Sequence, residues 1–199
     1  MGIYGLTGGI GVGKTTVANL LKGSGIPVVL GDDVGREVVE KGTAGLSKVV
    51  EAFGDHILDC KGALDRKELG SAIFTDPTNR RKLEDIIHPL VLERSQFLFN
   101  TLIQAGNPIV VYESALLFET NRHHEMEGVI LINSTQKNRI SRVQARDGSA
   151  EEEVKQRNLD TKSFKVTQIT FGLKFPGKGR QGSVTMELTA PDKCNLNES

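Results

Sequence analysis

The chain contains no tryptophan and only two cysteines among its 199 residues. Cys60 and Cys194 lie far apart and fit neither the C-x-x-C spacing of a metal site nor a framework of disulfides. No apolar run is long enough to cross a bilayer, and no basic and apolar leader precedes the first apolar run. Lysine plus arginine and aspartate plus glutamate number 25 each, so no net charge favours nucleic acid or anionic membranes. We expect a cytoplasmic protein without nucleic-acid or membrane partners, and composition leaves the oligomeric state open.

Glycine is concentrated near the N-terminus, where residues 8–15 read Gly-Gly-Ile-Gly-Val-Gly-Lys-Thr. This stretch fits the phosphate-loop pattern G-x-x-x-x-G-K-[ST], and it follows the apolar run at residues 3–6 and precedes a helical pattern. Glycines in such a turn allow successive backbone N–H groups to converge on an anion at the start of the helix. The loop residues predicted to bind the phosphates of a nucleoside triphosphate are Gly9, Ile10, Gly11, Val12, Gly13, Lys14, Thr15 and Thr16. The alternative is a glycine-rich turn without a ligand.

Two side chains of this loop have distinct expected roles. The Lys14 ammonium would reach the β- and γ-phosphates, and the Thr15 hydroxyl would complete the coordination of Mg²⁺. A phosphate loop indicates only nucleoside triphosphate, so the rest of the chain has to distinguish a motor, a switch and a kinase.

Four short apolar runs rich in β-branched residues predict the strands of a parallel α/β sheet, at residues 3–6, 27–30, 109–112 and 129–132. Residues 34–105 lack such a run and are predicted to be mostly helical, an inserted lobe that would hold the second substrate. Asp76 and Pro77 predict a helix start, with Asp76 as the cap. Pro89 restrains His88 and predicts another helix boundary there.

Acidic residues follow two of the predicted strands. Asp32 and Asp33 end the second, where ligands of parallel sheets gather. Either carboxylate could accept the proton of an attacking hydroxyl or hold Mg²⁺ through water, or could cap a helix at residues 34–40. We assign the functional role to Asp32 and the cap or first-turn role to Asp33. Glu113 ends the third strand and is either a Mg²⁺-organising residue or a solvated strand end.

An arginine cluster follows the fourth strand. Arg139, Arg142 and Arg146 are spaced three and four residues apart and would share one helical face, with Arg157 further on. Such a face suits a lid that closes on a triphosphate and neutralises charge in the transition state. The alternative is ordinary surface ion pairing with the acidic residues nearby, which would stabilise little.

Several further segments, in this order and spacing, resemble one kinase family. They are Gly5-Leu6-Thr7-Gly8-Gly9-Ile10-Gly11-Val12-Gly13-Lys14-Thr15-Thr16-Val17-Ala18, Gly25-Ile26-Pro27-Val28, Arg36-Glu37-Val38-Val39, Phe53-Gly54, Leu64-Asp65-Arg66-Lys67-Glu68-Leu69, Ile73-Phe74, Ile87-His88-Pro89, Leu116-Leu117-Phe118-Glu119 and Ala145-Arg146-Asp147-Gly148. Over residues 1–157 the chain is similar to dephospho-CoA kinase.

The resemblance implies a phosphate-loop NTPase fold of three α/β layers, with a helical CoA-binding lobe at about residues 34–105 and a lid at about residues 136–157. It implies transfer of the γ-phosphoryl of ATP to the ribose 3′-hydroxyl of dephospho-CoA, the last step of coenzyme A biosynthesis. Lys14 and Thr15 match the ATP and Mg²⁺ positions, Asp32 the catalytic base, and Arg142 and Arg146 the lid. Arg66, His88 and Pro89 match the acceptor-binding lobe. We assign catalysis to Asp32, Lys14 and Arg142.

The chain departs from the family at two places. Leu30-Gly31-Asp32 stands where the family usually reads Asp-Ala-Asp, so the first carboxylate is missing. After Arg157 the family's Gln-containing helix and Asn-x-Gly turn are absent. The tail at residues 158–199 instead alternates apolar and polar residues around 164–188, as an antiparallel strand would, and its fold is left open.

Other functions remain at this stage. One is another small-molecule phosphate-loop kinase, and a second is a nucleotide-binding but inactive relative, suggested by the divergent tail. A third is a GTPase-like switch, because residues 32–35 match D-x-x-G. The guanine-reading N-K-x-D tetrapeptide is absent from the sequence, which argues against the switch.

Overall fold

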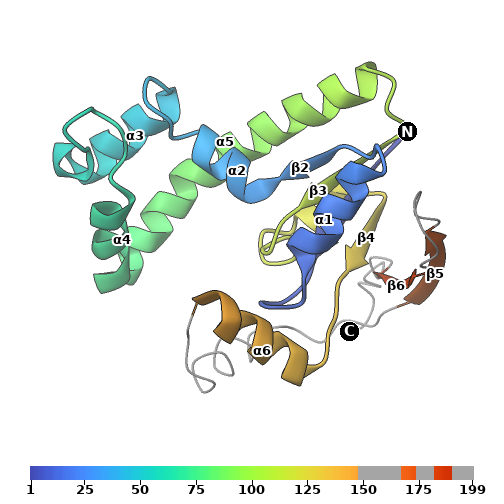
Figure 1. The fold of residues 1–199 in the computed structure, drawn as a ribbon. Helices are drawn as coiled ribbons and strands as arrows, with labels where there is room; N and C mark the ends of the chain where they lie inside the picture. Colours follow the sequence, from blue (N-terminus) through green and yellow to red (C-terminus); the bar gives the residue numbers. More distant parts are fainter. Residues whose placement is uncertain (148–166, 174–181, 190–199) are drawn as a thin grey trace, which may run out of the picture. The chain divides into compact units, whose positions relative to one another are not determined.

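A computed structural model of the chain describes residues 1–147, 167–173 and 182–189. The protein divides into two compact units (Figure 1). The sheet unit comprises Met1–Val28 and Asn107–Ser199, and the helical unit comprises Val29–Gly106.

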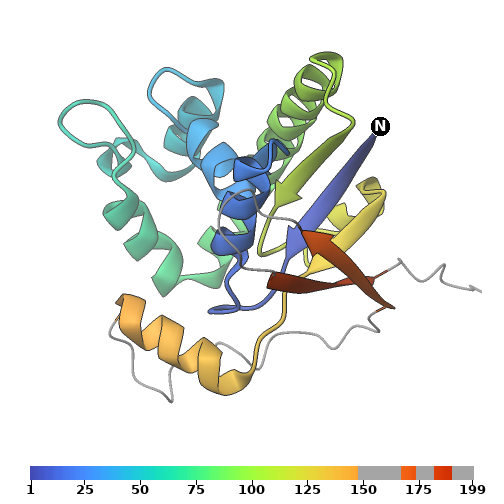
Figure 2. The ribbon, with the colours of Figure 1, turned by 45° about the vertical axis from the view of Figure 1, so that its right-hand side comes forward.

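The sheet unit is organised around the central strand β1 (Gly2–Thr7) (Figure 2). This strand pairs in parallel with β3 (Ile109–Glu113) and with β4 (Gly128–Leu131). The strand order is β2-β3-β1-β4-β6-β5, with β2 at Val28–Leu30. All four strands expected from the apolar runs are present. Since β1 and β3 are parallel and in register from Gly2↔Ile109 to Leu6↔Glu113, their carboxyl ends meet at one edge of the sheet.

The core of the sheet unit consists of the β-branched and leucine side chains of these strands. Leu6 and Val110 are completely buried. Helix α1 (Lys14–Gly23) buries Ala18 and Leu21. Leu117 packs so closely over Gly5 that a Cβ there would lie 2.4 Å from the Leu117 Cδ2 atom. Burial of such side chains contributes about 1.5–3 kcal/mol each to stability, which anchors the strand leading into the phosphate loop.

The chain after β4 adds helix α6 (Gln136–Asp147) and two antiparallel strands, β5 (Thr167–Leu173) and β6 (Gly182–Thr189). Strand β6 also pairs antiparallel with β4, so the tail supplies the sheet with its next strand on that side. The alternating pattern in the tail, whose fold the sequence leaves open, thus coincides with two antiparallel strands. Arg157, the end of the expected lid and the remaining tail residues lie outside the described residues.

The helical unit holds the long stretch that lacks strand patterns. Its elements are α2 (Gly31–Glu37), α3 (Ala44–Phe53), the short 3₁₀ helix η1 (Asp55–Ile57), α4 (Arg66–Thr75) and α5 (Pro77–Gln104). A second 3₁₀ helix, η2 (Arg122–Glu125), belongs to the sheet unit. The buried cluster of the helical unit is built on Val39, Val49, Ile57 and Leu69. None of the helices in the described ranges has the length and apolar character needed to cross a membrane.

Helix α5 starts as expected and ends differently. The Asp76 side chain accepts a hydrogen bond from the Thr78 N–H at 2.8 Å, and Pro77 occupies the first turn. The boundary expected at His88 and Pro89 is wrong, because α5 continues through Pro89 to Gln104. An internal proline removes one backbone hydrogen bond. Packed side chains on both sides of it, with Ile87 against the buried cluster and Phe99 buried, hold the helix together.

Helix α2 begins earlier than the predicted 34–40 helix, at Gly31. Its N-cap is Leu30, and no side chain caps it. Of the two roles expected for Asp33, cap or first-turn residue, the cap is wrong and the first-turn position is confirmed; Asp32 lies in the same turn. The shift arises because α2 follows β2 without an intervening turn, and carboxylates in a first turn are stabilised by the helix dipole without capping it.

Candidate phosphate-binding site

The phosphate loop connects β1 to α1 through glycines with left-handed backbone. Gly11 has φ 74° and Gly13, the N-cap of α1, has φ 101°. L-residues with a side chain rarely adopt these angles, whereas glycine does so without steric cost. Lys14 is the first residue of α1, so the unpaired N–H groups at the helix start adjoin the loop. The loop thus has the strand, turn and helix context that the sequence pattern requires.

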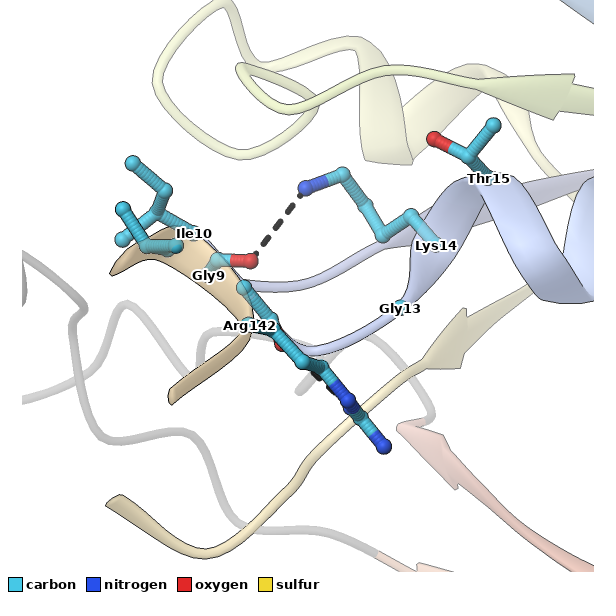
Figure 3. Close-up of a pocket in the computed structure, with 8 residues that line it drawn as sticks. Gly9, Ile10, Gly13, Lys14, Thr15 and Arg142 are labelled. Carbon is cyan, nitrogen blue, oxygen red and sulfur yellow. Dashed lines mark hydrogen bonds between the residues drawn. The ribbon is translucent and has the colours of Figure 1, made fainter. Parts of the chain in front are cut away.

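A cavity of about 200 Å³ lies against this loop (Figure 3). The residues that line it come from the loop, the start of α1 and helix α6: Gly9, Ile10, Gly11, Gly13, Lys14, Thr15, Arg142 and Val143. The structure therefore brings together six of the eight predicted loop residues with one of the predicted lid arginines. Of the other two, Val12 is buried and Thr16 is exposed on α1.

Lys14 extends back over the loop (Figure 3). Its Nζ donates to the Gly8 carbonyl at 2.7 Å and to the Gly9 carbonyl at 3.3 Å. The ammonium is half-buried and held beside the cavity. This position puts a positive charge where an anion in the cavity would meet it.

Arg142 and Arg139 reach the loop from α6. Arg142 Nη1 donates to the Val12 carbonyl at 2.8 Å, to the Gly11 carbonyl at 3.3 Å and to the Ser134 hydroxyl at 3.4 Å. Arg139 Nε donates to the Ile10 carbonyl at 3.0 Å. Burial lowers the pKa of the Arg139 guanidinium from its ordinary value. Both arginines therefore bind the backbone of the loop, and Arg142 also binds the Ser134 side chain.

Two oxygen-bearing side chains are the predicted magnesium residues. Thr15 is exposed in the first turn of α1 and lines the cavity, and Glu113 ends β3 beside Leu6 of β1. Within the described residues, no group of three or more His, Cys, Asp or Glu could hold a metal ion. One hydroxyl and one carboxylate fit Mg²⁺, which keeps several waters and takes most remaining oxygens from nucleotide phosphates.

The predicted acceptor residues belong to the helical unit. Asp32 is exposed in the first turn of α2, Arg66 is the exposed first residue of α4, and His88 and Pro89 are exposed on α5. No hydrogen bond or ion pair of the Asp32 carboxylate occurs in the part of the chain that the structure describes. Arg146 belongs to α6, but its side chain lies outside that part.

Comparisons with known proteins agree with this geometry. A sequence model of the family described as dephospho-CoA kinase matches residues 2–163. The chain belongs to the dephospho-CoA kinase family. A dephospho-CoA kinase of Shouchella clausii is 42% identical over 153 residues, which are 77% of this chain and 78% of that protein. One from Thermobifida fusca is 43% identical over 154 residues, 77% of this chain and 76% of that protein.

Solved structures are similar over the same part of the chain. The crystal structure of TT1252 from Thermus thermophilus aligns with a TM-score of 0.64 and 34% identity, covering 79% of this chain and 78% of that one. A dephospho-CoA kinase from Campylobacter jejuni aligns with a TM-score of 0.58 at 22% identity, which bears on the fold alone. The expected α/β phosphate-loop fold is confirmed. Membership of a dephospho-CoA kinase family decides against the GTPase-like switch, and residues 32–35 lie inside α2.

Sequence reasoning placed Arg139 in the arginine cluster but assigned it no site role, and it missed Ser134 and Val143. Arg139 binds the Ile10 carbonyl and Arg142 those of Gly11 and Val12, and Val143 is buried and lines the cavity. Two arginines three residues apart with an apolar residue beside the second indicate a helix face that packs as well as carrying charge. This spacing is the feature of the sequence that indicates a packing role for the helix face.

Gly11 provides a first test of the loop. A Cβ at this position would lie 2.6 Å from the Arg139 carbonyl oxygen and 2.9 Å from Val143 Cγ2, in addition to the strain at φ 74°. We expect Gly11→Ala to weaken ATP binding by about tenfold or more, because strain of about 1–3 kcal/mol must be relieved by moving the loop or α6. Isothermal titration calorimetry measures the change.

The matched control is Gly23→Ala at the end of α1, where nothing lies within 4 Å of the added Cβ. This variant should bind ATP like the wild type. Unchanged ATP affinity in Gly11→Ala would show that the loop conformation described here is not the one that binds nucleotide.

Proposed function

We propose that the protein transfers the γ-phosphoryl group of ATP to the ribose 3′-hydroxyl of dephospho-CoA, giving coenzyme A and ADP. The observation that carries this proposal is the cavity at the phosphate loop, lined by Lys14 and Arg142, in a chain of the dephospho-CoA kinase family. Phosphoryl transfer needs mainly positioning and stabilisation of charge, which a loop of N–H donors and two cations supply.

Each charged residue has a proposed part in the reaction. Lys14 moves from the Gly8 and Gly9 carbonyls to the β- and γ-phosphate oxygens. Arg142 lies across the same cavity and offsets negative charge on the transferring group. Asp32 accepts the proton of the 3′-hydroxyl as its oxygen attacks, a role that suits an exposed carboxylate without a hydrogen bond or ion pair in the described residues.

Magnesium is proposed as the cation of the reaction. When bound, the ion would offset negative charge on the triphosphate. Thr15 would contribute its hydroxyl to the ion, and Glu113 would orient a water bound to it. Both residues lie in the sheet unit. Thr15 lines the cavity at the loop, and Glu113 is in register with Leu6, near the end of the strand that leads into the loop.

The helical unit is the proposed acceptor-binding lobe. Arg66, His88 and Pro89 are exposed on α4 and α5, so their side chains are accessible to a substrate. Residues 136–157, including Arg146, are the proposed lid. The protein is proposed to act in the cytoplasm, where its few cysteines would stay reduced.

An acceptor competition tests the proposed reaction. The full chain is incubated with ATP, Mg²⁺ and an equimolar mixture of dephospho-CoA, adenosine, AMP and pantothenate, and the products are identified by mass. We expect coenzyme A and ADP as the dominant products. Phosphorylation of another acceptor would support a different phosphate-loop kinase, and nucleotide binding without any product would support an inactive relative.

A further inference from the structure

We propose that Arg139 is a positioning residue of the phosphate loop: together with Arg142 it fixes the orientation of three successive peptide groups so that their N–H groups face the phosphates. This inference rests on the proposed function, because it concerns the site at which ATP binds. It assigns a role to a residue outside the proposed catalytic set.

The contacts that carry the inference follow the loop in order. Arg139 Nε donates to the Ile10 carbonyl at 3.0 Å, and Arg142 Nη1 donates to the carbonyls of Gly11 at 3.3 Å and Val12 at 2.8 Å. Three consecutive loop carbonyls therefore accept hydrogen bonds from guanidinium groups of one helix. Hydrogen bonds from a charged donor are about twice as strong as neutral ones, so these orientations are held firmly.

When a hydrogen bond fixes the direction of a peptide carbonyl, it also fixes the direction of the N–H in the same peptide group. A trans peptide is planar, with its C=O and N–H pointing in opposite directions. Fixing the Ile10 carbonyl toward Arg139 thus turns the Gly11 N–H away from that guanidinium. The same holds for the N–H groups of Val12 and Gly13, whose preceding carbonyls Arg142 binds. Successive N–H groups turned to one side form the concave donor set that binds phosphate.

Packing around Arg139 ties its backbone to the loop as well. The Cβ position of Gly11 faces the Arg139 carbonyl oxygen at 2.6 Å, and Ile10 packs against the buried pair Ile140 and Val143. Arg139 is half-buried, whereas its neighbour Lys137 on the same helix is exposed. A desolvated guanidinium depends on its hydrogen bonds, so loss of the Ile10 contact is costly.

A direct role in binding phosphate is the alternative for Arg139. The variant Arg139→Lys distinguishes the two roles, because lysine reproduces the charge of arginine but not its hydrogen-bonding geometry. Lysine provides a positive charge for phosphate but no planar Nε donor at the same position. Positioning therefore predicts that Arg139→Lys fails to restore the loop, and charge neutralisation predicts that it largely succeeds.

The test uses Arg139→Lys and Arg139→Met in the full chain, with Lys137→Met as the matched control on the exposed side of α6. Two quantities are measured: the affinity for ATP by calorimetry, and the ¹H–¹⁵N shifts of the Gly11, Val12 and Gly13 amides before and after addition of ATP. Dispersed amide signals elsewhere verify that each variant is folded.

We expect both Arg139 variants to bind ATP about tenfold or more weakly and to lose the ATP-dependent shift of the Gly11 amide, with the control unchanged. Wild-type affinity and shifts in Arg139→Lys would overturn the positioning role. Both measurements concern ATP binding and not phosphoryl transfer. If the wild type failed to phosphorylate dephospho-CoA, the proposed function would be wrong, but the affinity and amide shifts would still test the role of Arg139.

Discussion

Replacing Lys14 with alanine is expected to lower kcat by about 10²–10³-fold or more while the fold stays intact. Removal of one preorganised donor to developing charge has an effect of this order in other enzymes. Lys14 is the first residue of α1, and its Nζ donates to the Gly8 and Gly9 carbonyls of the loop beside the cavity. Its loss therefore removes charge from the cavity without opening the core. Steady-state kinetics with ATP and dephospho-CoA measure the change.

Lys22→Ala is the matched control for Lys14→Ala. Lys22 is an exposed lysine in the last turn of the same helix, where its removal costs only a small interaction with the helix dipole. Its kcat should equal that of the wild type, and thermal unfolding verifies that both variants are folded. Turnover of Lys14→Ala within a few-fold of the wild type would exclude the phosphate loop as the site of transfer.

The second large expected effect is a loss of kcat when a carboxylate is removed from the acidic pair at the start of α2. Asp32→Asn is expected to lower kcat by about 10²–10⁴-fold with little change in ATP affinity, because asparagine keeps the size of the side chain but cannot accept the proton of the hydroxyl. Asp33→Asn is the internal control. Asp33 forms an exposed pair with Arg36 at 3.6 Å, a contact that stabilises little.

Apart from the exposed pair of Asp33 with Arg36, the two variants differ locally only in the proposed chemistry. Asp32 and Asp33 are both exposed in the first turn of α2, so the loss of a carboxylate near the helix N-terminus costs each about the same, roughly 0.3–1 kcal/mol. A difference in kcat between them therefore reports the reaction itself. If Asp33→Asn is the more damaging of the two, the assignment of the base is reversed.

The strands of the sheet could be predicted from the sequence because each is indicated by a short run of neighbouring residues. Strands buried on both faces read as short apolar runs, and those at residues 3–6 and 109–112 correspond to β1 and β3 with one or two residues added. The phosphate loop was predictable for the same reason, since the glycines and Lys14 are contiguous. The helix cap at Asp76 likewise depends only on its neighbours.

The errors arose where distant contacts override local preference. Helix α5 passes through Pro89 because side chains on either side of it are packed in the unit's interior. Helix α2 starts at Gly31, three residues before the predicted start, because β2 leads directly into it. The hydrogen bond from Arg139 to Ile10 spans 129 residues, so no local pattern could specify it. The arginine spacing predicted a shared face but not the carbonyls that it contacts.

The most direct test of the central claim follows the phosphoryl group itself. ATP labelled at the γ-phosphate is incubated with the full chain, Mg²⁺ and dephospho-CoA, and the position of the label in the product is determined by ³¹P NMR and mass. We predict that the label appears on the ribose 3′-oxygen of coenzyme A, with one ADP formed per label transferred. Label found only in inorganic phosphate, or on another position of the acceptor, would contradict the account.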